Sequence, residues 1–329
     1  MTSAGIAFLF PGQGSQYPGM GKDLFDEFEI VRNTYGEASE ILGYDIAKLS
    51  FDDAGDQINL TRFTQPVLLT HSIACCRAFA EHTDNAISPN LAAGHSLGEY
   101  SALVCANSLS FALALQLVKT RGELMGKYGE GEMEALMIDL ESAESLAEQH
   151  YCGIAACNLP NQNVVGGRAE DLDALVSTMA EKFPGKRSTR LKTEGAFHTY
   201  YMVEAARRFR QALNQADFKS PRIDVLSNFT GGVHDTDINA IKSRLFLQLF
   251  NPVLWHKNLV TAGSAGVELI IEFGGGLGKG ESAAEKRPAL ESIVKKTFRG
   301  ADSPPDYLSV INLATLQETI AAVTTDSAL

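Results

Sequence analysis

The chain has 329 residues, of which 45% are hydrophobic and 21% charged, and its formal net charge is −12 at pH 7. This composition is typical of one large globular domain, or of one with a smaller domain inserted. The negative charge argues against nucleic-acid or membrane-surface binding as the main function. Five cysteines without a Cys-x-x-Cys pair argue against a disulfide framework or a zinc site, so a reduced, cytoplasmic compartment is expected.

The sequence predicts neither a signal peptide nor a membrane-spanning helix. Residues 1–10 carry no basic region and run directly into an apolar segment. No apolar run reaches the ~18 residues that a membrane-spanning helix needs.

Short apolar runs alternate with helical patterns in the first 130 residues. A run at 6–10, stopped by Pro11 and Gly12, predicts a buried strand, and 91–93 predicts a second one. Helices are predicted at 65–82, 99–106 and 111–128. The alternation predicts an α/β domain with a mainly parallel sheet.

Residues 132–192 have a different pattern. Strands are predicted at 135–140, 153–157, 163–166 and 188–191, and helices at 142–150 and 170–183. This β-α-β-β-α-β order is the ferredoxin-like pattern. We therefore predict a small domain at 131–195, inserted into a large domain that is formed by 1–130 and 196–329.

The large-domain pattern resumes after the insertion. Residues 198–215 predict a helix, and 223–227 and 269–273 predict strands. Residues 300–329 are polar at both ends, and partial mobility is expected there.

Residues 94–98, Gly-His-Ser-Leu-Gly, match the Gly-x-Ser-x-Gly pattern of a serine nucleophile. They lie between a predicted strand and a predicted helix, where glycines allow the sharp turn that exposes the Ser96 hydroxyl. The helix N-terminus would supply N–H groups for an oxyanion. The alternative is a chance match in a chain with 29 glycines. The strand–turn–helix context favours the nucleophile.

A nucleophilic serine needs a general base. Seven histidines are available: His71, His82, His95, His150, His198, His234 and His256. His95 adjoins the serine, so its side chain is expected to point elsewhere, and His71 and His82 fall inside a predicted helix. His198 lies where the chain re-enters the large domain, but spacing alone does not select it.

Four motifs follow one another along the chain. They are Phe-Pro-Gly-Gln-Gly-Ser-Gln at 10–16, Gly-His-Ser-Leu-Gly-Glu-Tyr-Ser-Ala-Leu at 94–103, Gly-Ala-Phe-His at 195–198 and Gln-Leu-Phe-Asn-Pro-Val at 248–253. In this order, and with Arg121-Gly122, they resemble the malonyl-CoA:acyl-carrier-protein transacylase family over nearly the whole chain up to about residue 278. The resemblance implies an α/β-hydrolase-like large domain with a ferredoxin-like insert.

The resemblance also implies a role for individual residues. Ser96 would be the acylated nucleophile, and His198 would be its base and acid. Arg121 would grip the malonyl carboxylate, because a planar guanidinium matches a carboxylate with two parallel hydrogen bonds. The remaining roles are oxyanion-hole N–H groups from Gln13 and Leu97, a His198-orienting backbone carbonyl from Gln248, and substrate contacts from Phe197, Met125 and His95.

Three of these residues have ordinary alternatives when the resemblance is set aside. Arg121 and Gln248 could be exposed helix residues, as most arginines and glutamines are. Gln13 could be a turn residue after a strand.

The implied reaction is a ping-pong transfer of malonyl from malonyl-CoA, through a malonyl-Ser96 ester, to the phosphopantetheine thiol of an acyl carrier protein. It requires no metal or redox cofactor. The bulky Phe197, and Leu97 after the serine, resemble the malonyl-selective pattern, although one methyl group is worth only ~1–3 kcal/mol of discrimination.

Some segments depart from the fatty-acid enzymes. Residues 195–202 look more like a polyketide acyltransferase, Gly-Gly-Gly at 274–276 replaces the usual Gly-Pro-Gly, and 278–299 match poorly. We therefore expect a discrete, trans-acting acyltransferase that serves a polyketide assembly line.

The carrier protein is expected to be acidic, so docking on this acidic chain needs a local basic patch. The candidates are Lys186, Arg187, Arg190 and Lys192 in the small domain, and Arg207, Arg208 and Arg210 after His198. A solvated helix face is the alternative for the second group.

Other functions were weighed against this one. The glycine-rich segment 274–280 does not match a phosphate-binding loop, because Gly280 follows Lys279 where Ser or Thr is needed. Residues 12–17 do not match a dinucleotide-binding motif, because Tyr17 occupies the position of the third glycine. An acyl hydrolase that clears carrier proteins would have no use for Arg121. A catalytically silent docking protein would not need Ser96, His198 and Arg121 together.

Overall fold

The computed structural model describes residues 5–53 and 55–325. Its large sheet has five parallel strands in the order β7-β2-β1-β8-β9. These strands are β1 (Gly5–Phe10), β2 (Leu91–Gly94), β7 (Asp224–Val225), β8 (Val267–Phe273) and β9 (Asp306–Val310). The central strands are nearly continuous runs of buried apolar residues, as expected where helices cover both faces of a parallel sheet.

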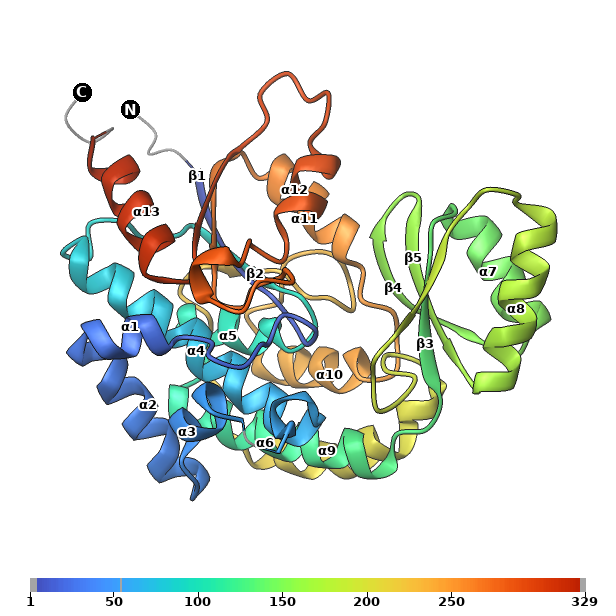
Figure 1. Cartoon of the computed structure of the whole chain (residues 1–329), viewed down its shortest axis with the longest axis horizontal. Coiled ribbons are helices and arrows are strands. Elements are labelled where there is room, and N and C mark those ends of the chain that lie inside the picture. The colour runs from blue at the N-terminus through green and yellow to red at the C-terminus, as the bar shows by residue number, and fades with distance from the viewer. Residues whose placement is uncertain (1–4, 54, 326–329) are drawn as a thin grey trace.

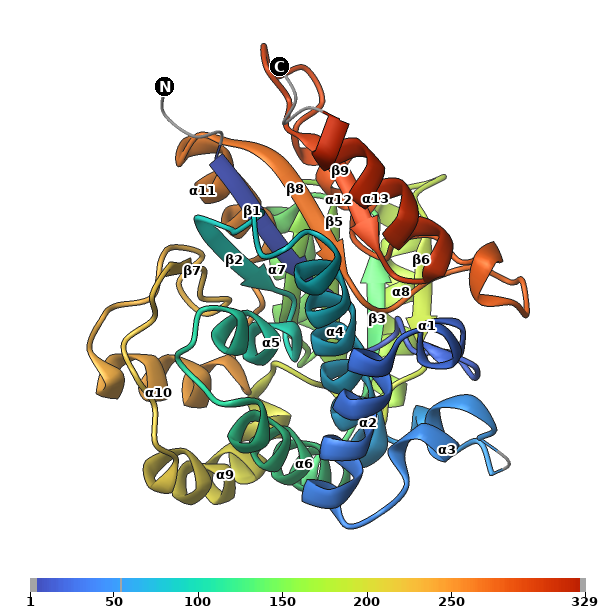
Figure 2. The same ribbon diagram turned by 90° about the vertical axis from the view of Figure 1, so that its left-hand side faces the viewer.

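Helices surround this sheet (Figures 1 and 2). Those of the large domain are α1 (Lys22–Glu27), α2 (Glu29–Leu42), α3 (Ile46–Phe51), α4 (Thr61–His82), α5 (Gly98–Cys105), α6 (Phe111–Tyr128), α9 (Val203–Gln215), α10 (Ile238–Gln248), α11 (Trp255–Ser264), α12 (Glu291–Thr297) and α13 (Leu313–Thr325). Short 3₁₀ helices lie at Gln57–Asn59, Tyr200–Met202 and Ala283–Glu285. The α4 helix is buried along most of its length, between the sheet and α6.

A second, antiparallel sheet forms the green part of Figure 1, to one side of the large sheet. Its strand order is β4-β5-β3-β6, from β3 (Glu132–Leu136), β4 (Gly153–Leu159), β5 (Gln162–Gly167) and β6 (Ser188–Leu191). Helices α7 (Leu140–Gln149) and α8 (Ala169–Lys182) cover one face.

The two faces of this small sheet belong to different cores. Leu136 and Val165 pack with α7 and α8, whereas Met133 and Val164 pack with the main core of the large domain. Successive strand residues point to opposite faces, so this division follows from the alternation of side chains. The face that bears Met133 and Val164 also borders the pocket described below.

The predicted fold class is confirmed: an α/β protein with a mainly parallel sheet and a β-α-β-β-α-β insert. Predicted elements at 111–128 and 188–191 have the observed bounds. The domain limits at 130/131 and 195/196 stay a prediction. Among the described residues, no helix is both long and apolar enough to span a membrane.

The predicted bounds of two elements are wrong. The strand predicted at 135–140 is β3, which begins at Glu132 and ends at Leu136, and α7 already begins at Leu140. The helix predicted at 198–215 begins only at Val203, because His198 lies in a turn with φ 62° that a helix does not allow. Residues 306–325, where the sequence predicted no element, form β9 at the sheet edge and α13 beside it. Buried Val310 and Leu316 anchor this segment. The partial mobility expected at 300–329 stays a prediction, and residues 326–329 lie outside the described part of the chain.

Candidate active site

Ser96 lies in a tight turn between β2 and α5, with a φ of 54°. The glycines on either side leave no room for a side chain. A Cβ on Gly94 would stand 1.9 Å from the carbonyl carbon of Gly98, and a Cβ on Gly98 would stand 2.2 Å from the carbonyl oxygen of Phe10. The Ser96 backbone N–H donates to Asn228 Oδ1 at 2.6 Å, which holds the turn. This is the strained strand–helix turn of a serine nucleophile.

His198 is in hydrogen-bond contact with the serine. Its Nε2 lies 2.7 Å from Ser96 Oγ, and its Nδ1 lies 2.6 Å from the backbone carbonyl oxygen of Gln248. A carbonyl oxygen only accepts, so Nδ1 carries the proton and Nε2 is left to accept from the serine hydroxyl. This tautomer is the one that a general base needs.

Burial and, next, the positive charge of Arg121 lower the pKa of His198 to about 3. The hydrogen bond to Gln248 acts in the opposite direction. The ring is therefore neutral at physiological pH, ready to accept a proton.

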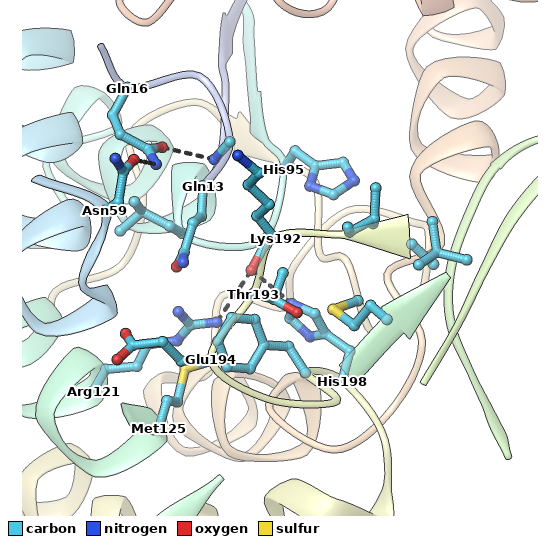
Figure 3. Close-up of a pocket in the computed structure, with 18 of the residues that line it drawn as sticks. Gln13, Gln16, Asn59, His95, Arg121, Met125, Lys192, Thr193, Glu194 and His198 are labelled. Carbon is cyan, nitrogen blue, oxygen red and sulfur yellow. Dashed lines mark hydrogen bonds between the residues drawn. The ribbon is translucent and has the colours of Figure 1, made fainter. Parts of the chain in front are cut away.

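The Arg121 side chain extends from α6 towards Ser96 and His198 (Figure 3). Its side chain is only 1% exposed. Nη1 donates to Gln65 Oε1 at 2.9 Å, and Nη2 donates to Gln248 Oε1 at 3.0 Å and to Ser96 Oγ at 3.2 Å. Its Nε has no hydrogen-bond partner, and no ion pair with it occurs among the described residues. A buried cation whose partners are neutral is suited to receive a carboxylate.

The three side chains open into a pocket of about 790 Å³. Gln13, Leu97 and Met125 line it from the large domain. The small sheet contributes Met133, Ala156, Asn158, Val164 and Leu191, and the chain that returns to the large domain contributes residues 192–194 and 197–198. The pocket therefore lies between the two sheets, where a substrate would be covered from both sides.

Gln13 and Leu97 are the predicted oxyanion donors. Gln13 follows β1, Leu97 precedes α5, and both line the pocket beside Ser96. Within the described part of the chain, neither backbone N–H donates to another residue. The Gln13 side chain donates to Thr61 Oγ1 at 3.1 Å, which fixes its loop against α4.

The other predicted substrate residues also border the pocket. His95 places Nε2 2.9 Å from Asn158 Oδ1 in the small sheet, so its ring faces that residue and not the serine. Burial lowers the pKa of His95. Met125 accepts from Gln65 Nε2 at 3.4 Å, and Phe197 is 5% exposed at the pocket wall.

Some site residues were not foreseen: Gln65, Glu99, Asn228 and His234. Asn228 follows β7, and polar residues at the carboxyl ends of parallel strands are a recognised signal of a site. Glu99 directly follows the glycine of the serine motif. Neither feature alone shows that the two residues meet, 129 positions apart in the sequence.

The predicted basic patch is less uniform than its sequence suggests. Lys186 and Arg187 are exposed. Arg190 is bound by Glu132, Glu134 and Asp173, which neutralise it. Lys192 is exposed and lines the pocket. In the second group Arg210 is exposed, Arg207 and Arg208 both contact Glu204, and Arg208 also lies over Tyr128.

A serine on a strand–helix turn, a neutral histidine base and unused N–H donors define a serine-dependent acyl-transfer enzyme. The model of the acyl transferase domain family matches residues 7–262. A malonyl CoA-acyl carrier protein transacylase of Bacillus subtilis is 38% identical over 303 residues, covering 89% of this chain and 90% of that protein. A polyketide biosynthesis malonyl CoA-acyl carrier protein transacylase, BaeC of Bacillus velezensis, is 37% identical, covering 77% and 87%.

Solved structures of the same family are also similar to this chain. The crystal structure of a malonyl CoA-acyl carrier protein transacylase from Clostridium perfringens has a TM-score of 0.88 at 30% identity and covers 99% of both chains. The chain therefore belongs to the acyl transferase domain family, and within it to the malonyl CoA-acyl carrier protein transacylases.

Proposed function

We propose that this enzyme transfers a malonyl group from malonyl-CoA to the phosphopantetheine thiol of an acyl carrier protein, through a malonyl-Ser96 ester. One observation carries the proposal: Ser96 Oγ is in contact with both a histidine base, His198 Nε2, and a buried cation, Arg121 Nη2. The base activates the serine, and the cation selects an acyl group that bears a carboxylate.

In the first half-reaction, His198 Nε2 takes the Ser96 proton and Oγ attacks the thioester carbonyl. The oxyanion accepts hydrogen bonds from the backbone N–H groups of Gln13 and Leu97. The C–S bond then breaks, and the coenzyme A sulfur leaves with the proton from His198. The malonyl-Ser96 ester remains, with its free carboxylate on the guanidinium of Arg121.

In the second half-reaction, the carrier thiol gives its proton to His198 and attacks the ester carbonyl. The C–O bond to Ser96 breaks, and the serine regains its proton from His198. Atoms and electrons balance without a redox partner or metal, so we propose a cofactor-free reaction. Water competes for the ester, and the walls of the pocket from both sheets limit its access.

The polyketide role is a finer proposal. It rests on the relative BaeC, whose name assigns it to polyketide biosynthesis, and on the resemblance of residues 195–202. We further propose that the carrier protein docks beside the exposed Lys192, which lines the pocket, and extends towards the exposed Lys186 and Arg187 at the other end of β6. A cytoplasmic location goes with this partner.

Intact-protein mass spectrometry after brief incubation with malonyl-CoA, acetyl-CoA and methylmalonyl-CoA tests the proposal. Wild type should gain a malonyl adduct, Ser96→Ala should gain none, and Arg121→Ala should lose malonyl or gain acetyl instead. An acetyl adduct on wild type without a malonyl adduct would overturn the role of Arg121 and favour an acyl hydrolase.

A further inference from the structure

Glu99 is a carboxylate that the proposed reaction does not use. It lies in the first turn of α5 and is completely buried. Oε1 accepts from His234 Nε2 at 2.7 Å, and Oε2 accepts from the Asn228 backbone N–H at 3.0 Å and from Gln248 Nε2 at 2.8 Å. Burial of a carboxylate is strongly unfavourable unless it is paired and hydrogen-bonded, so its position under the serine needs a reason.

His234 does not provide that reason as a charged partner. Its Nδ1 is buried without a hydrogen-bond partner among the described residues. A protonated ring would therefore leave a buried N–H unsatisfied, whereas a neutral ring with its proton on Nε2 fits the site. The cluster of Glu99, His234 and Asn228 then carries one negative charge, on Glu99.

The side-chain amide of Gln248 connects this charge to Arg121. Its Nε2 donates to Glu99, and its Oε1 accepts from Arg121 Nη2 at 3.0 Å. A carboxylate only accepts and a guanidinium only donates, so these two partners permit one orientation of the amide. The backbone carbonyl of the same residue accepts from His198 Nδ1. Gln248 therefore touches both the cation and the base.

We propose that Glu99 is a positioning residue for malonyl selection: it is the internal counter-charge of Arg121, relayed through Gln248. It holds the Gln248 amide so that the oxygen faces Arg121 and the guanidinium stays beside Ser96. The inference rests on the proposed function, because it assumes that Arg121 receives the malonyl carboxylate. Glu99 itself touches neither the substrate nor the reacting atoms.

The consequence can be separated from a general loss of structure. In Glu99→Gln an amide faces the Gln248 amide, which can then turn and present its NH₂ group to Arg121. Arg121 loses an acceptor and leaves the position from which it meets the carboxylate. An acetyl group makes no contact of this kind, so acetylation of Ser96 should suffer less than malonylation.

The experiment compares initial rates of malonyl and acetyl adduct formation on Ser96, by rapid quench and intact-protein mass spectrometry. Glu99→Gln should lower the malonyl-to-acetyl rate ratio about ten- to a hundredfold, the range of one hydrogen bond to a charged group. Glu99→Asp keeps the charge with a shorter reach, and it should lower the ratio in the same direction by less. It replaces Glu99→Gln if that variant does not fold.

Glu272→Gln is the matched control. Glu272 is equally buried and accepts from the backbone N–H groups of Ala289 and Leu290 and from Tyr307, yet it does not border the pocket. Its ratio should stay at the wild-type value even if its melting temperature falls. Equal slowing of both adducts in the Glu99 variants would overturn the inference. Absence of a malonyl adduct on wild type would instead overturn the proposed function.

Discussion

Nη2 of Arg121 lies 3.2 Å from Oγ of Ser96, and both residues line one pocket. The cation is therefore placed to bind the carboxylate of a malonyl group while the serine attacks the thioester carbonyl at the other end of that group. A planar guanidinium can do this with two parallel hydrogen bonds, whereas an ammonium group offers only a point charge.

Replacement of Arg121 by lysine tests this geometry. Arg121→Lys keeps the positive charge but cannot form the two parallel hydrogen bonds, so malonyl-Ser96 formation should slow by about ten- to a hundredfold. Acetyl-Ser96 formation should change little. Stopped reactions analysed by mass spectrometry measure both rates, and an unchanged malonyl rate would show that charge alone suffices.

The pH profile tests the protonation state of His198. Burial and the charge of Arg121 lower its pKa to about 3, so the ring stays neutral as the pH falls through the ordinary histidine range. The rate of malonyl-Ser96 formation should therefore be nearly flat between about pH 8 and about pH 5. A loss of rate centred near the ordinary histidine pKa of about 6.5 would contradict the assigned environment. In Arg121→Ala the repulsion is gone, so any midpoint in the pH profile of acetyl-Ser96 formation should move to higher pH.

Phe197 should limit the size of the extender unit. Its buried ring forms part of the pocket wall next to His198, so Phe197→Ser opens space beside the acyl α-carbon. The rate of methylmalonyl loading relative to malonyl loading should rise roughly ten- to two-hundredfold. This corresponds to a loss of about 1–3 kcal/mol of discrimination against the extra methyl group. Competition between the two coenzyme A esters measures the ratio, and an unchanged ratio would show that another residue sets the limit.

The glycines of the serine turn should be indispensable to folding. Gly98→Ala would place a Cβ 2.2 Å from the carbonyl oxygen of Phe10, so unfolding should require about 3 kcal/mol less, or the protein should not fold. Gly36→Ala is the control, because Gly36 is an exposed residue inside α2 with no atom near the new methyl group. It should stabilise the protein by about 0.5–1 kcal/mol. Urea unfolding of both variants measures the difference.

The sequence predicts the parts of this site whose signal is local. Ser96 is recognisable because its motif, strand and helix adjoin one another. His198 is different, because 102 residues separate it from the serine and spacing does not choose it among seven histidines. Only the resemblance to a family pointed to it. Glu99 and His234 form a hydrogen bond although they are 135 positions apart in the sequence. Local sequence patterns do not predict such a contact.

The same distinction explains the errors in regular structure. The helical pattern after His198 is genuine, but it does not show that His198 lies in a turn with a φ of 62°. Because of this turn, the helix begins only at Val203. Likewise, β9 is half-buried and lies at the sheet edge, so its five residues give a weak signal. Tertiary packing against β8 makes it a strand.

The most direct test of the whole mechanism follows one malonyl group through both half-reactions. Malonyl-enzyme is formed, freed of malonyl-CoA and mixed with a phosphopantetheinylated acyl carrier protein, and the masses of both proteins are recorded against time. The malonyl mass should leave Ser96 and appear on the carrier at the same rate, with little free malonate. Loss of the adduct to free malonate, with no malonyl carrier, would contradict the transferase mechanism and identify a hydrolase.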